Sequence, residues 1–296
     1  MNHFSGLVSI IIPVYNAQDY LAECLDSALN QTYDKIEVIA INDGSTDNSL
    51  DILKKYSDKI KIISKKNGGT ASALNEGIKV MTGTWFKWLS ADDLLYPNAI
   101  EDLILEATKV ENNENMIFYS NYDIIDSNGK ILETFIEQNY NHLERFEQNV
   151  ILLDHYFGNG TTSFINKSAI QRFGMFNETI GYKEDYEFWL RYCLLNNCGL
   201  FLIPKVLAKY RVHQNQLTKE NVTISLSQTN KIRKYILDKV SPEERKKYEK
   251  ALRVYQKNKP VTLRGRHIVR DIMLRILPKS VSGPMLKSYM DLKEKT

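Results

Sequence analysis

The sequence has 296 residues, of which 43% are hydrophobic and 25% charged, and its formal net charge is +3. This is the composition of a folded globular chain and excludes a disordered or collagen-like one. Residues 231–296 carry 19 basic and 7 acidic side chains, whereas residues 1–230 carry 20 basic and 29 acidic ones. The acidic main part argues against nucleic-acid binding, and the basic end suits an anionic membrane surface.

Strands alternate with helices over the first 120 residues or so. The β-branched run at residues 8–13 is typical of a strand buried on both faces. Apolar residues at helical spacing separate it from further strands expected at residues 36–41, 60–63, 84–89 and 116–122. This order predicts an α/β fold, with a mostly parallel, Rossmann-like sheet flanked by helices.

Polar residues stand at the ends of three of these strands. Tyr15-Asn16 follows the first strand, Asn42-Asp43 the second, and Asp92-Asp93 the fourth. The carboxyl ends of parallel strands share one sheet edge, where ligands bind in such folds. Adjacent carboxylates repel each other, and a divalent cation carrying a diphosphate would neutralise them. We therefore predict a nucleotide-sugar site at this edge, with its metal at Asp92-Asp93.

The later elements follow a looser pattern. We expect a hairpin over residues 123–135, a short helix at 146–155, a loop at 158–162, a strand at 163–166, a helix at 183–195 and strands at 199–203 and 206–213. Glu184 and Asp185 lie near the start of the 183–195 helix, where acids favour the helix dipole. The chain beyond residue 217 reads as helical, with an opening signal at residues 241–244.

Six motifs occur in an order that resembles the family 2 glycosyltransferases of GT-A fold, of the bacterial surface-polysaccharide type. They are Ser-Ile-Ile-Ile-Pro-Val-Tyr-Asn (9–16), Asn-Asp-Gly-Ser-Thr-Asp (42–47), Asn-Gly-Gly (67–69) with Asn75 and Gly77, Leu-Ser-Ala-Asp-Asp (89–93), Glu-Asp-Tyr (184–186) with Trp189, and Tyr-Arg-Val-His (210–213). The resemblance covers roughly residues 7–217. It suggests a GT-A domain over residues 1–217, with a nucleotide-binding half (1–122) and an acceptor half (123–217), followed by a basic helical extension (218–296).

The resemblance implies an inverting enzyme that moves a hexose or N-acetylhexosamine from a UDP-sugar to a glycan acceptor. Cell-surface polysaccharide or lipopolysaccharide synthesis is the process it suggests, and Mn²⁺ or Mg²⁺ the cofactor. By position, the nucleotide-binding residues would be Pro13, Tyr15 and Asn16 around the nucleoside, Asp43 at the uracil ring, and Asn67, Gly69 and Asp92.

The same resemblance assigns the metal and the general base. Asp92, Asp93 and His213 would hold the metal, and Asp185, with Glu184 beside it, would take the acceptor's proton. The chemistry suits these residue types, since a hard cation offsets charge on the leaving diphosphate and a carboxylate can deprotonate the attacking hydroxyl.

Two positions depart from the family pattern. Ser90 stands where an acid often begins the metal motif, and Leu74 where an arginine often precedes the asparagine at position 75. A non-catalytic nucleotide-sugar binding protein therefore stays open as an alternative. Sugar transfer to a polyprenyl phosphate is a further alternative within the same enzyme class. Each motif also has a plain structural interpretation, such as a turn and helix cap at Asp43 or a dipole-favoured helix start at Glu184-Asp185.

Cysteine content and apolar runs bear on location. Cys24, Cys193 and Cys198 lack the nearby histidines of a zinc site and suit buried thiols in a reducing compartment. No signal peptide precedes the first strand, and no apolar run approaches the roughly 20 residues of a membrane-spanning helix. We therefore expect a cytoplasmic protein, with the inner face of the plasma membrane as a peripheral location.

The basic end offers a means of reaching that membrane. Ile268, Ile272 and Ile276 form an apolar stripe edged by arginines within residues 261–277. Such a helix can lie on an anionic membrane and bring the enzyme to a lipid-linked glycan, which would make residues 261–296 a peripheral membrane contact. Packing on its own domain, or on a second subunit in a homodimer, is the alternative.

Overall fold

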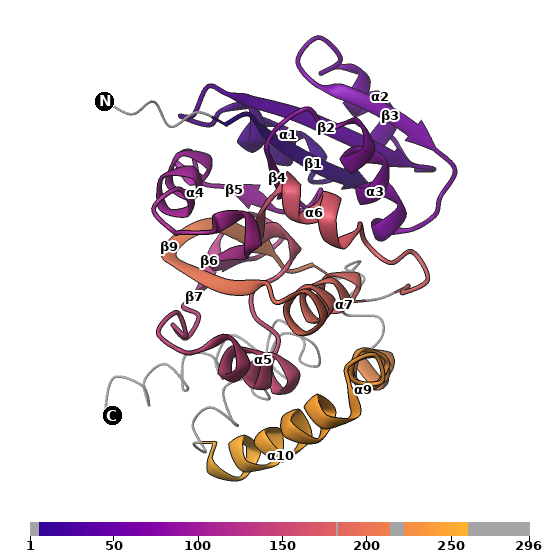
Figure 1. Ribbon diagram of the computed structural model, residues 1–296. Helices are drawn as coiled ribbons and strands as arrows, with labels where there is room; N and C mark the ends of the chain where they lie inside the picture. The colour runs from indigo at the N-terminus through magenta and orange to yellow at the C-terminus, as the bar shows by residue number, and fades with distance from the viewer. Residues whose placement is uncertain (1–5, 182, 214–221, 260–296) are drawn as a thin grey trace.

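A mixed nine-stranded sheet forms the centre of the molecule, in a computed structural model that describes residues 6–181, 183–213 and 222–259 (Figure 1). The strand order is β3-β2-β1-β4-β8-β6-β9-β5, with β7 paired to β6 outside this path. The strands are β1 (Val8–Val14), β2 (Ile36–Asp43), β3 (Lys61–Lys65), β4 (Trp85–Trp88), β5 (Leu94–Leu95), β6 (Met116–Ile125), β7 (Ile131–Phe135), β8 (Phe164–Asn166) and β9 (Gly199–Arg211).

Helices cover both faces of the sheet and enclose two hydrophobic clusters, one on each side. The helices are α1 (Leu21–Leu29), α2 (Ser49–Lys54), α3 (Thr70–Val80), α4 (Ala99–Ala107), α5 (Arg145–Asp154), α6 (Lys167–Phe173), α7 (Glu184–Leu190), α9 (Val222–Leu237) and α10 (Pro242–Asn258). The α/β fold expected from the sequence is confirmed.

The N-terminal half is the parallel part of the sheet. β1 pairs in parallel with β2 and with β4, and β2 pairs in parallel with β3. β8 then enters antiparallel between β4 and β6, while β6 and β9 run parallel to each other. The three N-terminal crossovers therefore bring the ends of β1, β2 and β4 to one edge.

The structure refines several expected elements. β9 is one strand rather than two, because a bulge absorbs Pro204 and Lys205: Ser120 pairs with Ile203, and Asn121 pairs with Val206. β9 ends at Arg211, so His213 follows the strand instead of lying in it. The 183–195 helix begins as α7 and continues as a π-helical segment, Arg191–Leu195. β5 and α6 were not expected from the sequence.

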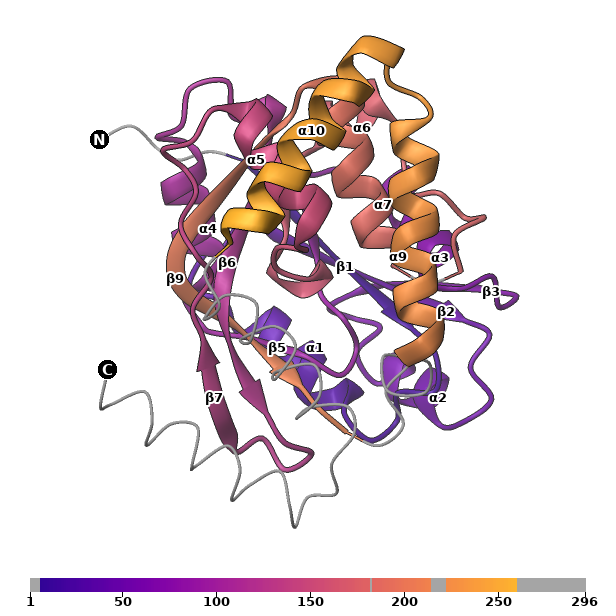
Figure 2. The same cartoon turned by 90° about the horizontal axis from the view of Figure 1, so that it is seen from below.

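The described part of the extension packs against the main domain. α9 lies along α7 and α10 along α5, at the bottom of Figure 1 and in front in Figure 2. Ile232 and Ile236 are fully buried, and Arg233 donates to the Tyr186 hydroxyl at 2.8 Å. Among the described residues, no helix is both long and apolar enough to cross a membrane. The amphipathic segment expected at residues 261–277 lies outside the described residues.

Candidate active site

The polar clusters at the ends of β1 and β2 meet at the predicted sheet edge. Val14 pairs with Asn42 in the parallel register, so Asn16 and Ser45 follow side by side. The Asn16 side chain accepts from the Thr46 amide at 2.8 Å, and the Asn16 amide donates to the Ser45 hydroxyl at 3.2 Å. Asn16 has φ +48°, a left-handed conformation that asparagine tolerates better than most residues. Tyr15 beside it is 49% exposed, and Pro13 is partly buried in β1.

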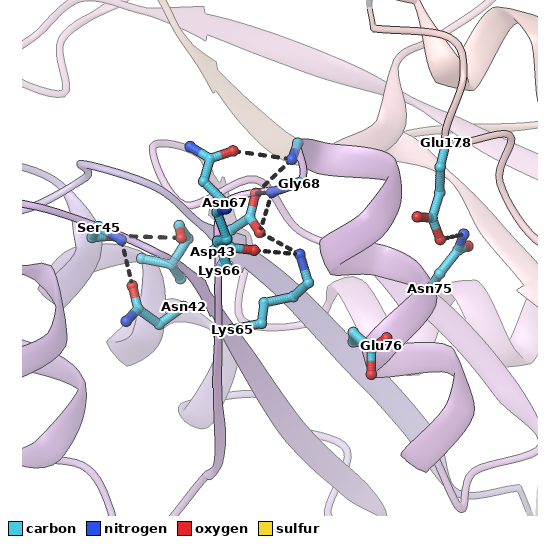
Figure 3. Close-up of polar contacts among 12 residues, drawn as sticks. Asn42, Asp43, Ser45, Lys65, Lys66, Asn67, Gly68, Asn75, Glu76 and Glu178 are labelled. Atoms are coloured by element: carbon cyan, nitrogen blue, oxygen red, sulfur yellow. Dashed lines mark hydrogen bonds and ion pairs between the residues drawn. The ribbon is translucent and has the colours of Figure 1, made fainter.

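Asp43 is the centre of a closed polar cluster (Figure 3). Its buried carboxylate accepts from Lys65 Nζ at 2.7 Å and from the amides of Gly68 and Gly69 at 2.8–3.2 Å. Three donors thus contact the carboxylate, and the Gly68 N–H is shared between its two oxygens. Gly69 has φ +84° at the start of α3, which a side chain would strain. Asp43 therefore fixes the shape of the loop that leads into α3, and Asn67 in that loop accepts from the Gly69 amide at 3.2 Å.

Asn75 ties α3 to a distant segment, also seen in Figure 3. Its amide nitrogen donates to the Phe176 carbonyl at 3.0 Å and to Glu178 at 2.8 Å, and its carbonyl accepts from the Phe176 amide at 3.0 Å. The hydrogen bond from Asn75 lowers the pKa of Glu178. Leu74, at the place where the family often has arginine, is fully buried in the core.

The two carboxylates after β4 have different surroundings. Asp93 is buried, accepts from the Thr161 hydroxyl, and accepts from the Arg211 amide at 2.8 Å. Burial, and then the charge of Asp92, raise the pKa of Asp93 well above its usual value. The side chain of Asp92 is 25% exposed, and its Oδ2 lies 3.0 Å from His213 Nε2. Asp92 and His213 thus present a carboxylate and an imidazole together at the sheet edge.

A buried lysine, Lys87, binds the backbone next to the Asp92-Asp93 pair. Lys87 Nζ donates to three carbonyl oxygens, those of Trp88, Thr161 and Ser163. Burial lowers the pKa of Lys87 to about 7, against the opposite effect of the nearby Asp93 charge. The Thr161 hydroxyl also accepts from the Ser90 amide at 3.2 Å and lies 3.1 Å from Ser90 Oγ. Ser90, at the place where the family often has an acid, therefore helps to hold Thr161.

Arg211 connects the end of β9 to the same corner. Its guanidinium is fully buried and donates to the Asp92 carbonyl at 2.8 Å, to the turn carbonyls of Asp126 and Ser127, and to Glu23 at 2.6 Å. A guanidinium has five N–H donors in a fixed plane, so it can donate to several acceptors at once. Arg211 thereby sets the backbone from which Asp92 and His213 project.

The second acidic pair, Glu184-Asp185, opens α7. Asp185 accepts from the Tyr156 hydroxyl and, at 2.8 Å, from the Tyr186 amide, while Trp189 Nε1 donates to the Tyr156 hydroxyl at 3.3 Å. Burial raises the pKa of Asp185, and the hydrogen bond from Tyr156 opposes this rise. Burial and the adjacent Asp185 charge raise the pKa of Glu184 to about 7. The site therefore contains a carboxyl group that titrates near neutrality.

One short segment links the two acidic pairs. Tyr156 contacts Asp185, and Thr161, five residues later, contacts Asp93. Five residues of extended chain span at most about 18 Å, so the two pairs lie across one short loop from each other. Sequence reasoning placed a loop at 158–162, in which residues 159–161 could contact donor or acceptor, but it did not predict the contact of Thr161 with Asp93 or identify Tyr156, Lys65 and Lys87. Of these, only Lys87 gave a signal, because a lysine within Trp-Phe-Lys-Trp is unusual in a buried strand.

Comparison with known proteins identifies the family of this chain. The family model described as glycosyl transferase family 2 matches residues 9–174. An uncharacterised glycosyltransferase of Rickettsia typhi is 42% identical over 219 residues, which are 73% of this chain and 67% of the relative. The chain belongs to glycosyl transferase family 2. It is accordingly a glycosyltransferase of GT-A fold, as the motif order predicted.

Two further comparisons concern a synthase and a solved structure. The hyaluronan synthase of Pasteurella multocida is 34% identical over 198 residues, which are 66% of this chain and 19% of that protein. The structure of S. aureus TarS residues 1–349 with UDP-GlcNAc matches with a TM-score of 0.64 and 17% identity, over 83% of this chain and 70% of that one. The second likeness establishes the fold.

Proposed function

We propose that this family 2 transferase moves a hexose or N-acetylhexosamine from a UDP-sugar to a glycan acceptor, with inversion, in cell-surface polysaccharide or lipopolysaccharide synthesis. The observation that carries the proposal is the short 156–161 segment, which joins the Asp92–His213 edge to the Asp185 carboxylate. The TarS complex with UDP-GlcNAc supports the choice of donor, and the similarity to the hyaluronan synthase supports the choice of a glycan acceptor.

The nucleoside would bind between Tyr15 and the loop that Asp43 shapes. Tyr15 is half exposed and offers an aromatic face for a base. Asp43 already accepts from three donors of the protein, so a direct contact to the uracil ring would compete with these donors. We therefore assign Asp43 to holding Lys65 and the Gly68–Gly69 amides in place, rather than to reading the base itself.

The Asp92–His213 pair suits a divalent metal that arrives with a diphosphate. No third His, Cys, Asp or Glu joins them among the described residues. Such a site fits Mg²⁺ or Mn²⁺, which are commonly held by one or two protein ligands together with substrate phosphates. When bound, the cation would offset negative charge on the departing diphosphate. We assign its ligation to Asp92 and His213, with Asp93 as the buried support behind them.

The transfer step would use Asp185 as the general base. The acceptor hydroxyl oxygen attacks C1 of the sugar on the face opposite the diphosphate, and its proton passes to the Asp185 carboxylate. As the new bond forms, the bond from C1 to the diphosphate oxygen breaks and its electron pair leaves with UDP. Tyr156 holds Asp185 in one orientation through its hydroxyl, and Trp189 holds Tyr156.

A panel of UDP- and GDP-sugars tests this proposal, with UDP or GDP release measured in Mn²⁺, in Mg²⁺ and in EDTA. We expect UDP release from one or a few UDP-sugars when glycan acceptors are added, and its loss in EDTA. Turnover of GDP-sugars alone would contradict the donor assignment. Tight UDP-sugar binding without turnover over a broad acceptor panel would instead favour a non-catalytic binding protein.

We also propose that residues 261–296 bring the enzyme to a lipid-linked acceptor at the inner face of the plasma membrane. The exposed basic residues of α10, among them Lys246, Lys250 and Arg253, extend the positive charge into the described part of the chain. Flotation with anionic liposomes, compared between the full chain and a chain ending at residue 260, checks this. Equal flotation would contradict a role for the tail, and dimerisation of the full chain alone would favour a subunit contact.

A further inference from the structure

Trp88 carries a buried hydrogen-bond donor that the protein does not use. Its side chain is at the end of β4 and is 5% exposed. Trp88 Nε1 is the single buried side-chain nitrogen or oxygen without a hydrogen-bond partner in the part of the chain that the structure describes. An indole N–H can only donate, and leaving such a group unpaired in the interior costs free energy. We therefore expect this N–H to donate a hydrogen bond to a molecule that is not part of the protein.

The other two tryptophans differ in this respect. Trp189 Nε1 donates to Tyr156, as described above. Trp85 belongs to the hydrophobic cluster on the opposite face of the sheet, where it stacks on Phe164 with ring centroids 4.6 Å apart. Trp88 shares its cluster with Trp189, and Tyr156 packs against the same cluster. Trp88 thus lies on the side of the sheet where the proposed general base is held.

The position of the Trp88 ring is fixed by its neighbours. Gly160 lies so close that a Cβ there would stand 2.5 Å from Cδ2 and Cε3 of the indole, on the side away from Nε1. Phe176 packs edge-on against the ring, with ring centroids 5.7 Å apart, and its backbone exchanges two hydrogen bonds with the Asn75 side chain, which hold Phe176 in place. The N–H direction is therefore set before any ligand arrives, as a preorganised donor should be.

The strand position relates this donor to the diphosphate edge. Trp88 precedes Asp92 by four residues in the same strand and turn, and Gly160 precedes Thr161, which holds Asp93. The sugar of a nucleotide-sugar is bonded directly to the diphosphate that the Asp92–His213 pair would hold. A pyranose carries hydroxyl oxygens, and an N-acetylated one also carries an amide oxygen, and both kinds accept hydrogen bonds.

We propose that Trp88 Nε1–H donates to a hydroxyl or acetamido oxygen of the donor sugar, so that Trp88 helps the enzyme to recognise the sugar separately from UDP. This inference rests on the proposed function. It predicts that the contribution of Trp88 is confined to ligands that carry the sugar. UDP alone, held by the Asp43 loop and the Asp92 edge, would not use it.

Calorimetric binding of UDP and of UDP-GlcNAc, UDP-GalNAc, UDP-glucose and UDP-glucuronate tests the inference. Trp88→Phe retains an aromatic ring and deletes the donor, and Trp85→Phe is the matched control in the same strand. For Trp88→Phe we expect about tenfold weaker binding of the preferred UDP-sugar, because one hydrogen bond to the sugar is lost. The affinity for UDP should stay within about twofold of the wild type. Trp85→Phe should leave both affinities unchanged.

Each other outcome has a definite meaning. Unchanged UDP-sugar affinity in Trp88→Phe overturns the inference and leaves the proposed function standing. Equal loss of UDP and UDP-sugar affinity shows a packing role and also overturns it. If the wild type binds none of the UDP-sugars more tightly than UDP and releases no UDP from them, the proposed function fails and the inference fails with it.

A measurement on the wild type covers the case in which Trp88→Phe does not fold. The chain has three tryptophans, so its indole N–H groups give three ¹⁵N-correlated NMR signals. Trp85→Phe and Trp189→Phe identify two of these signals and leave that of Trp88. We expect the Trp88 signal to shift downfield with the UDP-sugar but not with UDP. An equal shift with UDP alone, or no shift with the sugar, overturns the inference.

Discussion

This transferase has two pairs of neighbouring acidic residues, Asp92-Asp93 and Glu184-Asp185. The two pairs look alike in sequence, but their surroundings in the fold differ. At the end of β4, Asp93 is buried and hydrogen-bonded, whereas Asp92 stays partly exposed beside His213. At the start of α7, both acids are partly buried, Asp185 receives the Tyr156 hydroxyl, and the pKa of Glu184 rises to about 7. Pairing in sequence therefore does not give two equal carboxylates. In the proposed mechanism, Asp93 supports the metal ligand Asp92 in the first pair, and in the second pair Tyr156 holds the base Asp185 beside Glu184, whose pKa is raised.

The largest effect should follow from removing the proposed base. Asp185→Asn keeps the shape of the side chain but cannot accept the acceptor's proton, so we expect the transfer rate to fall about 10²–10⁴-fold. UDP affinity should stay close to that of the wild type, since Asp185 lies on α7 and not on the nucleotide edge. Steady-state transfer kinetics and calorimetry measure both. Asp51→Asn, an exposed acid with 69% of its side chain accessible, is the control, and retained transfer in Asp185→Asn would refute the assignment.

Substitution within the first pair should separate ligand from support. Asp92→Asn should retain its melting temperature and lose the metal-stimulated rate by roughly 10²-fold, as expected when a carboxylate ligand is removed. Asp93→Ala leaves the Thr161 hydroxyl and the Arg211 amide without their acceptor, so its stability should fall by about 1–3 kcal/mol. Metal titrations of the rate and urea unfolding check the two variants. The reverse pattern would show that Asp93 is the ligand.

Tyr156→Phe tests how Asp185 is held. The Tyr156 hydroxyl lowers the pKa of Asp185, so its removal should raise that pKa and protonate the base at higher pH. The acidic limb of the pH–rate profile should then move upward by about 1–2 pH units, with a larger loss of rate at low pH than at about pH 8, because a hydrogen bond to a charged group contributes about 1.5–3 kcal/mol. An unmoved limb would mean that Tyr156 serves packing alone.

The smallest effect concerns Glu184 and appears in stability. The pKa of Glu184 is about 7 in the folded state, whereas an unfolded glutamate titrates near pH 4.3. Glu184 thus stays protonated to a higher pH in the folded than in the unfolded state. The stability that this group contributes is therefore lost as the pH rises from about 4.3 to 7. The melting-temperature gain of Glu184→Gln over wild type should grow across that window and then level off, because above about pH 7 the group is ionised in both the folded and the unfolded state. A constant difference would disprove the linkage.

The convergence of Asn16, Asp43 and Asp92 was predictable from sequence, because strand alternation fixes which end of each parallel strand faces the site. The division of labour between Asp92 and Asp93 was not. It depends on Thr161 and Arg211, which reach Asp93 from 68 and 118 residues away. The closed hydrogen bonding of Asp43 likewise depends on Lys65 and the Gly68–Gly69 amides, whose directions no local pattern gives. Side-chain contacts between loops that are far apart in the sequence could not be predicted from the sequence.

The buried Arg211 has a consequence for how the protein is made. It joins Asp92 to Glu23 and to the 126–127 turn, and these partners precede it by 119, 188 and about 85 residues. Contacts of such long sequence separation form late, because much of the chain must be present before they stabilise anything. We infer that ribosome-bound chains ending near residue 200 fold their N-terminal strands yet cannot bind UDP with metal, and that chains reaching past residue 250 can. Pull-down of stalled chains on UDP resin would show the step, and binding by the shorter chain would contradict it. On this account, synthesis itself delays the enzyme's first encounter with its donor until the last strand of the sheet is in place.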